Sequence, residues 1–359
     1  MLKNNQYRSV ILWLLSGCFI IYIMIVVGCI TRLTHSGLSI TEWGVMGTLP
    51  PLNENQWQDV FFKYQQTPEF NEVNSDMTID QFKSIFWWEW THRFIGRTIL
   101  SGVFILGFLY FFMKKKLDQK LKKRFIFLFF LGAFQGVIGA WMVASGLNKI
   151  PAVSHYRLAL HLMSAFTVFA FTFWFALDLI FEKTVDTKKS NNSKLKPWLI
   201  ALFVVVIIQI IFGAFTAGFV ELSEENKPLF RPGQIFNTWP KMGESWVADQ
   251  VFSKSSFFEN FFENASGIQF VHRTFAFFVV ALVIIVWYKS NKLNLTKPQY
   301  NGITLLIYGI TIQFLLGIFT LIYQVPLLLG VLHQTGAFFL FVVCIFLVHQ
   351  FTYKKNNLS

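Results

Sequence analysis

The stretch that decides the fold begins at Trp87 and reads Trp87-Trp88-Glu89-Trp90-Thr91-His92-Arg93-Phe94-Ile95-Gly96-Arg97. It places a histidine, a carboxylate and two arginines at the start of an apolar run. A weaker copy in the second half reads Gln269-Phe270-Val271-His272-Arg273-Thr274-Phe275-Ala276. Two such copies predict a chain built by internal duplication.

The composition predicts a membrane protein. Of the 359 residues, 54% are hydrophobic and only 14% are charged, which excludes an ordinary soluble protein. A helix needs about 20 apolar residues to cross the hydrocarbon of a bilayer, whereas strands of a β-barrel are about half as long and alternate. Eight runs meet the helical requirement, near 10–30, 94–113, 125–144, 159–181, 198–220, 270–288, 303–323 and 326–351. We therefore expect an all-α polytopic membrane protein with eight transmembrane helices.

The charges predict how the chain is oriented. The net charge of +12 does not indicate nucleic acid, because lysines fill every second link between the runs while the other links are acidic or neutral. This positive-inside pattern places both termini in the cytoplasm and the two long loops outside. The first run lacks a small-residue cleavage site, so it is interpreted as a retained span. The expected location is the bacterial cytoplasmic (inner) membrane, in contact with lipid, rather than the mitochondrial inner membrane.

Short repeats divide the chain into two four-helix bundles with tandem pseudo-symmetry. Gln-x3-Gly and Gly-x-x-Thr recur among the odd-numbered runs, although small residues also recur simply where membrane helices pack. The predicted halves are residues 1–187, with the outer loop 33–88, and residues 188–359, with the outer loop 221–267. The aromatic stretch near Trp57 is either an amphipathic helix on the membrane surface or an ordered cap. All three cysteines fall in apolar runs, so no disulfide is expected.

Four histidines are candidate ligands of haem iron. His92, His161, His272 and His333 each lie near the outer end of an even-numbered run. Such runs all cross the membrane in the same direction, so the four lie at a similar depth. We expect His92 to face His161 in the first bundle and His272 to face His333 in the second, because two imidazoles can bind haem iron from opposite sides. A small residue follows each histidine by one turn, which would leave room for a flat porphyrin.

Arginines next to two of these histidines are candidate partners of the haem propionates. Arg93 and Arg273 follow His92 and His272 directly. A guanidinium group binds a carboxylate through two parallel hydrogen bonds. The alternative is that these side chains simply reach out to the membrane surface. Free zinc fits the four histidines poorly, because the set lacks cysteines and does not have an outer-face carboxylate for each pair.

A single carboxylate distinguishes the first half from the second. Glu89 stands three residues before His92, whereas Gln269 has that place before His272. A catalytic site needs such a group to move protons or to stabilise a developing cation. The alternative is an exposed carboxylate at the membrane surface that pairs with Arg93. Two other functions stay open at this point: a dihaem cytochrome b that only carries electrons, and a repeat-built transporter.

The chain resembles the haem A synthase family along nearly its whole length. The resemblance depends on these stretches: Thr31-Arg32-Leu33-Thr34, Ser36-Gly37-Leu38-Ser39, Glu42-Trp43, Leu49-Pro50-Pro51-Leu52, Pro68-Glu69-Phe70, Phe86-Trp87-Trp88-Glu89 and His92-Arg93. It is similar to the type that lacks a cysteine pair in the outer loops. The resemblance implies an oxidoreductase that converts the C8 methyl of haem O to a formyl group by successive hydroxylations, giving haem A for cytochrome oxidase.

The resemblance also implies roles for individual residues and for partners. His92 and His161 would flank the substrate haem O, with Glu89 as the required carboxylate. His272 and His333 would hold a resident haem b that relays electrons. Expected partners are haem O synthase (protohaem farnesyltransferase) and assembly factors of cytochrome oxidase. The oligomeric state stays open, a homo-oligomer included.

Overall fold

The computed structural model describes residues 7–42, 49–147, 151–181, 193–219 and 236–352. Within these residues the chain is helical apart from its links and one isolated β-bridge. The predicted basic link near residue 188, the beginning of the second long loop, and both termini lie outside the described residues.

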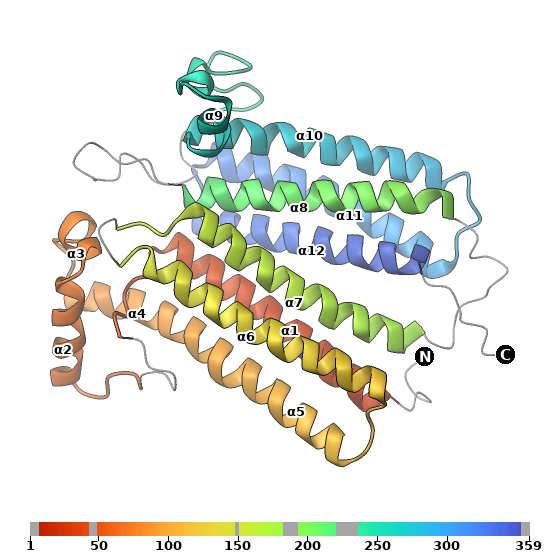
Figure 1. Cartoon of the computed structure of the whole chain (residues 1–359). Helices are drawn as coiled ribbons and strands as arrows, with labels where there is room; N and C mark the ends of the chain where they lie inside the picture. The colour runs from red at the N-terminus through yellow and green to blue at the C-terminus, as the bar shows by residue number, and fades with distance from the viewer. Residues whose placement is uncertain (1–6, 43–48, 148–150, 182–192, 220–235, 353–359) are drawn as a thin grey trace. The chain divides into compact units, whose positions relative to one another are not determined.

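Eight helices are long and apolar enough to cross a membrane (Figure 1). They comprise α1 (Arg8–Leu33), the continuous helix Ile79–Met113, α6 (Gln119–Ala144), α7 (His155–Phe181), α8 (Lys196–Gly218), α10 (Ala265–Ser290), α11 (Lys297–Ile322) and α12 (Leu327–Thr352). The continuous helix contains α4 (Ile79–Phe94), the π-helix η1 (Ile95–Leu100) and α5 (Ser101–Met113). Leu106 and Met113 on α5 are 68% and 78% exposed, as expected for side chains that face lipid. The eight predicted spans are confirmed.

Most of the spanning helices begin a few residues before the predicted apolar runs, and the second begins much earlier. The second span was expected from Phe94, but its helix begins at Ile79, where Thr78 and Gln81 form a capping box. The intervening residues are polar or aromatic, so hydropathy does not detect them. Similarly, His155 was predicted to lie before its span and is instead the first residue of α7. This correction leaves His155 buried next to Phe219.

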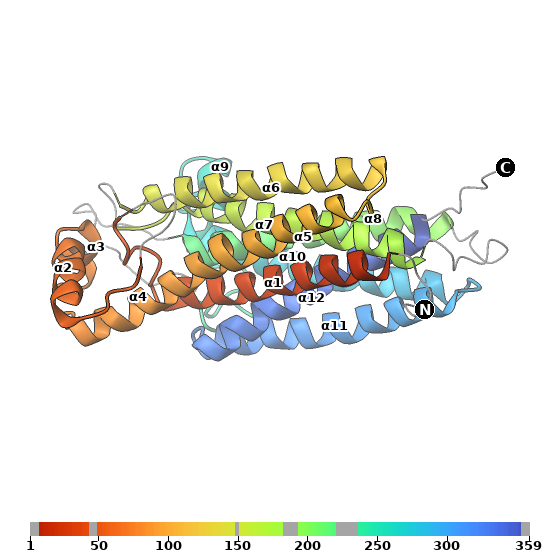
Figure 2. The same ribbon diagram turned by 90° about the horizontal axis from the view of Figure 1, so that it is seen from below.

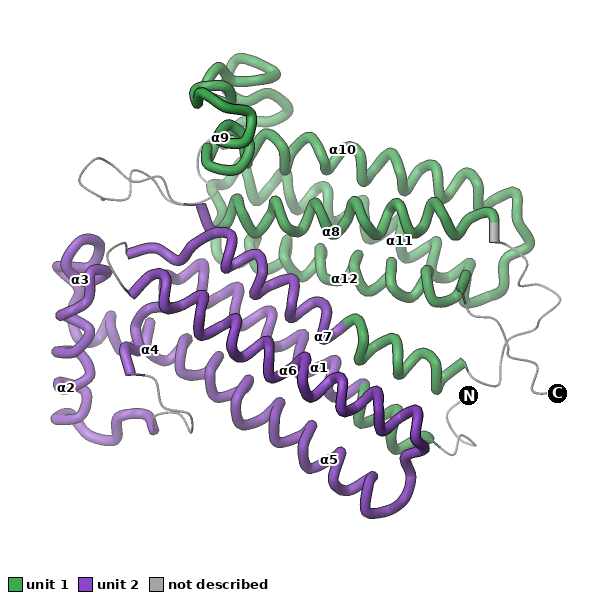
Figure 3. The backbone as a smooth tube through the Cα atoms, in the orientation of Figure 1, with its two compact units in different colours: residues 1–14, 170–217, 233–359 green, residues 15–169, 218–232 purple. Residues whose placement is uncertain are grey.

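The described residues belong to two compact units, which Figure 3 colours separately. Unit 2 contains residues 15–169 and 218–232. Unit 1 contains residues 1–14, 170–217 and 233–359. These ranges differ from the halves expected from sequence repetition, and the division at residue 187 and the pseudo-symmetry stay predictions.

In unit 2 the first long loop contains α2 (Glu54–Gln65) and α3 (Pro68–Val73), which lie at the beginning of α4 (Figure 2). Asn53 and Thr67 cap these two short helices. Trp57 and Tyr64 of α2 are buried against α4, with ring centres 5.0 Å from Phe86 and 5.1 Å from Phe82, respectively. The aromatic stretch is therefore a cap packed on the helix that carries His92.

In unit 1 two short helices, η3 (Asp249–Phe252) and α9 (Phe257–Phe262), pack at the beginning of α10. A side chain on Gly267 would lie 1.7 Å from the carbonyl oxygen of Asn260, so this close approach requires glycine. The helices α11 and α12 are joined by a tight turn in which Gln324 and Val325 have positive φ. This turn places the beginning of α12 beside the end of α11.

Candidate haem sites

The first histidine pair lies in unit 2, where each imidazole touches a glycine of another helix. His92 on α4 lies against Gly28 on α1, where an added Cβ would be 3.1 Å from the ring Nε2. His161 on α7 lies against Gly139 on α6, where an added Cβ would be 2.8 Å from the ring Cε1. Both histidines belong to the same compact unit, as the expected pairing requires.

The second pair lies in unit 1 and has the same construction. His272 on α10 lies against Gly213 on α8, and His333 on α12 lies against Gly317 on α11. An added Cβ at either glycine would be 3.0 Å from the ring Cε1. These distances are shorter than an ordinary van der Waals contact. Glycine at these places allows the rings to lie directly against the neighbouring backbones.

The spacing of the second pair fits two ligands on opposite sides of one iron. The ring centres of His272 and His333 are 6.4 Å apart, and the ring planes are perpendicular. Bonds of about 2 Å from a metal to each imidazole nitrogen place the two ring centres about 6 Å apart. A haem iron therefore fits between these rings. In the described part of the chain, no group of three or more His, Cys, Asp or Glu residues forms an alternative metal site.

Glutamines hold three of the four histidines. The Nε2 of Gln135 lies 3.2 Å from His161 Nδ1 and donates to the carbonyl oxygen of His161 at 3.1 Å. Gln313 does the same to His333, at 3.1 and 3.0 Å. Gln209 donates to the carbonyl oxygen of His272 at 2.9 Å. Gln135 and Gln313 therefore contact both the backbone and the ring of their histidines, whereas Gln209 contacts only the backbone of His272, whose Nδ1 has no partner among the described residues.

The sequence reasoning missed the contacts that these glutamines and glycines make with the histidines. Gln-x3-Gly was interpreted as a repeat marker and partly as helix packing. In the structure the glycine touches the imidazole, and the glutamine one turn earlier bonds to the same histidine. The signal was available in the spacing, because residues four apart share one helix face.

Glu89 is buried beside the first pair. It is 3% exposed, and its Oε2 accepts hydrogen bonds from Ser39 Oγ at 2.7 Å and from the backbone N–H of Ile40 at 2.8 Å. Its Oε1 forms an ion pair with Arg93, which also donates to the carbonyl oxygen of Ile40. The alternative of an exposed carboxylate at the membrane surface is therefore wrong, although Glu89 does pair with Arg93.

The equivalent place in unit 1 carries no charge. Gln269 is 2% exposed and donates to the carbonyl oxygen of Phe236 at 3.1 Å. Arg273 Nη2 donates to three loop carbonyls, those of Thr238, Pro240 and Lys241. Arg273 Nη1 is buried and has no partner among the described residues. That nitrogen is the donor best placed to serve an added carboxylate.

A second buried carboxyl group lies in the first long loop. Glu69 accepts a hydrogen bond from the Tyr64 hydroxyl at 3.2 Å, and this hydroxyl accepts one from Asn74 at 2.8 Å. Burial and the nearby charge of Glu89 raise the pKa of Glu69 to about 8, despite the opposing effects of Tyr64 and Arg32. The Glu69 carboxyl is therefore largely protonated at neutral pH.

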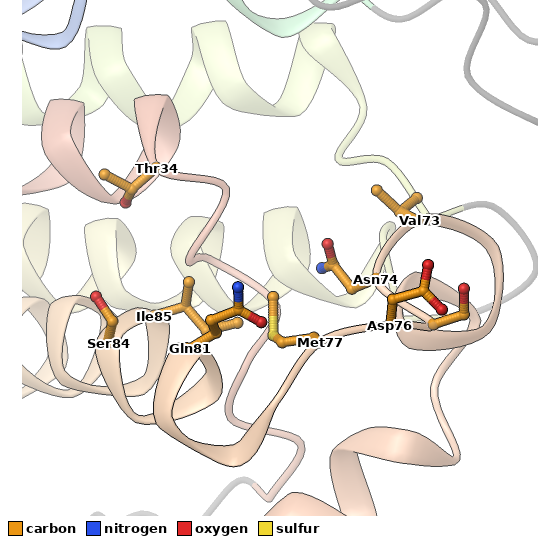
Figure 4. A pocket seen from close by; sticks show the side chains of 9 residues that line it. Thr34, Val73, Asn74, Asp76, Met77, Gln81, Ser84 and Ile85 are labelled. Carbon is orange, nitrogen blue, oxygen red and sulfur yellow. The ribbon is translucent and has the colours of Figure 1, made fainter.

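Asn74 also lines an open pocket of about 510 Å³ (Figure 4). Gln81, Ser84 and Ile85 of α4 form one side of it together with Thr34, which directly follows α1. The link between α3 and α4 forms the other side. Ile85 lies one helical turn before Glu89 on α4. The pocket therefore adjoins the helix face that leads to the first histidine pair.

Comparison with known proteins agrees with this arrangement. The family of cytochrome oxidase assembly proteins matches residues 11–345. A protein named haem A synthase from Flavobacterium psychrophilum is 46% identical over 98% of this chain and 100% of its own length. Its namesake from Nitrosospira multiformis is 40% identical over 97% of this chain and 95% of its own length. The chain belongs to the haem A synthase family of cytochrome oxidase assembly proteins.

Proposed function

We propose that this protein is a haem A synthase that oxidises the C8 methyl of haem O to a formyl group. The observation that carries the proposal is an asymmetry between two similar sites. Both histidine pairs are built against glycines, but only the first has a buried carboxylate beside it. A protein that merely carries electrons through two haems has no need of that charge at one of them.

In this proposal His272 and His333 hold a resident haem b. When bound, that haem supplies one-electron transfer, which suits a ligand pair held rigidly by Gln209 and Gln313. Arg273 would donate to a propionate through Nη1, since its Nη2 is already bonded to loop carbonyls. The loop that contains these carbonyls thereby fixes the guanidinium group.

His92 and His161 would flank the substrate, haem O. Converting a methyl to a formyl group removes four electrons and four protons and adds the oxygen of one water, or its equivalent from dioxygen. The protons must leave a buried site. Glu89 is the group that can accept and release them at its carboxylate oxygens, while Ser39, Ile40 and Arg93 hold it in place. Because Arg93 already forms an ion pair with Glu89, it would contribute less than Arg273 to binding a propionate.

The proposed setting is the bacterial cytoplasmic membrane, with both termini in the cytoplasm. Eight apolar helices support a multi-pass membrane protein, and the lysines of alternate links support this orientation. The substrate comes from an enzyme that prenylates protohaem, and the product is consumed by the assembly of cytochrome oxidase.

Adding haem O and a reductant system to the purified protein tests this function. We expect hydroxylated and formyl haem products, identified by mass. Retention of two haems without any oxidised product would instead favour a dihaem electron carrier of the cytochrome b type. The absence of haem from both sites would refute either function.

A further inference from the structure

The four histidines are not held equally. His161, His272 and His333 each receive a hydrogen bond from a glutamine that stands four residues before the contacting glycine. The corresponding residue for His92 is Met24, four residues before Gly28. A thioether cannot donate a hydrogen bond. Among the described residues, no glutamine replaces it at His92.

The backbone around His92 is also irregular. The α-helical geometry of α4 ends at Phe94, and the π-helix η1 begins at Ile95. Such π segments are rare, and they frequently occur at functional sites. Met24 packs against Gly96 within η1, where an added Cβ would be 2.9 Å from the methionine methyl group. A flexible side chain therefore contacts η1 at the place where a glutamine would otherwise hold the histidine.

His161 contrasts with His92 in every one of these respects. Gln135 contacts both its ring Nδ1 and its carbonyl oxygen, and Ser164 donates to the amide oxygen of Gln135. His161 lies inside α7, which is a regular α-helix. The two ligands of the first pair therefore differ in rigidity, whereas His272 and His333 are both held by glutamines.

We propose that His161 is the fixed ligand of the first pair and that His92 is the exchangeable one. When His92 leaves the substrate iron, a coordination position opens. This inference rests on the proposed function, because only a site of chemistry needs an open position. A substrate iron held by two histidines has no free position. Because no glutamine holds His92 and a π-helix follows it, His92 can withdraw from the iron while His161 keeps the substrate in place.

The test compares His92→Ala with His161→Ala after both variants are loaded with haem O. We expect His92→Ala to retain haem at the first site, with a high-spin signal in electron paramagnetic resonance, while His161→Ala loses most of that haem. The resident haem stays low-spin in both variants and reports that they are folded. Equal retention in the two variants, or retention only in His161→Ala, would overturn the proposal.

A second experiment keeps both histidines. Met24→Gln places an amide at the position that Gln135 has in its own pair, and we expect carbon monoxide to bind the reduced first-site haem at least tenfold more slowly. Met24→Leu is the matched control, because it preserves the volume and adds no donor. An unchanged rate in Met24→Gln contradicts the proposal.

The two ideas fail in different ways. If the wild-type protein oxidises haem O but the ligands behave alike, only the inference about His92 is wrong. If haem O binds at the first pair and is never oxidised while Met24→Gln still slows carbon monoxide, the proposed function is wrong and the exchangeable ligand stands.

Discussion

The two histidine pairs share a construction and differ in what surrounds it. In both, each imidazole lies against a glycine of another helix. The pair in unit 1 is held by glutamines on both sides and has a neutral Gln269 nearby. The pair in unit 2 has one glutamine, a π-helix and the buried Glu89. In our proposal, the single carboxylate and the single missing donor separate a site of chemistry from a site of electron transfer.

The largest expected effect is the loss of a ligand from the rigid pair. His272→Ala should remove the resident haem, because one remaining imidazole cannot hold the iron from both sides. The haem content, measured by the pyridine haemochrome spectrum, should fall by about one haem per protein, and oxidation of haem O should stop. Unchanged haem content would show that His272 is not a ligand.

The second largest effect is expected from Glu89, the carboxylate that only the first pair has. Glu89→Gln keeps the size of the side chain and removes its charge, so the first site should still bind haem O. Product formation should fall by about 100-fold or more, since a proton acceptor typically contributes that much. Gln269→Glu is the matched change in unit 1, and it should not create oxidation at the resident haem. A fully active Glu89→Gln variant would contradict the catalytic role.

A smaller effect is expected from the contact between helix and imidazole. Gly139→Ala places a methyl group against His161 and should weaken haem O binding about tenfold, because overpacking costs about 1–3 kcal/mol. Gly132 lies two turns earlier on α6 and has no atom within 4 Å of an added Cβ, so Gly132→Ala is the control. Titration of haem O by absorbance measures both variants. Equal affinities would show that the glycine contact does not position the ring.

The smallest expected effect concerns pH and Glu69. Its pKa in the folded protein, about 8, lies above its ordinary value of 4.5. The stability that the protonated carboxyl provides is therefore complete below pH 4.5 and is lost as the pH rises through 8. Glu69→Gln should remove this loss, so its thermal unfolding in detergent should depend less on pH between 5 and 8. The charged or titratable groups around it, Tyr64, Glu89 and Arg32, are unchanged in the variant.

The sequence predicts the spans and the histidines well, because apolar runs and repeated positions depend on local pattern. The eight spans and the proximity of His272 to His333 follow from it. The beginning of α4 could not be predicted from hydropathy, because residues 79–93 form a helix through capping and aromatic packing on α2. The burial of side chains could not be predicted from the sequence either. Only the packing of the helices shows that Glu89 is buried and that the Tyr64 hydroxyl donates to Glu69.

The glutamine contacts illustrate why the rest was missed. Gln135 and Gln313 are visible in the sequence, but their partners lie 26 and 20 residues away on another helix. The choice of partner depends on how the helices rotate against each other, which a repeat pattern does not determine. The same is true of Met24, whose importance is visible only once Gly28 is seen to touch His92.

The most direct test follows both haems of the purified protein during turnover. Haem O is added, reductant is supplied, and the pigments are extracted and identified by mass at successive times. The account predicts that one haem per protein stays haem b while the other passes from haem O to haem A. Two haems that both remain unaltered, or oxidation of the resident haem, would contradict it.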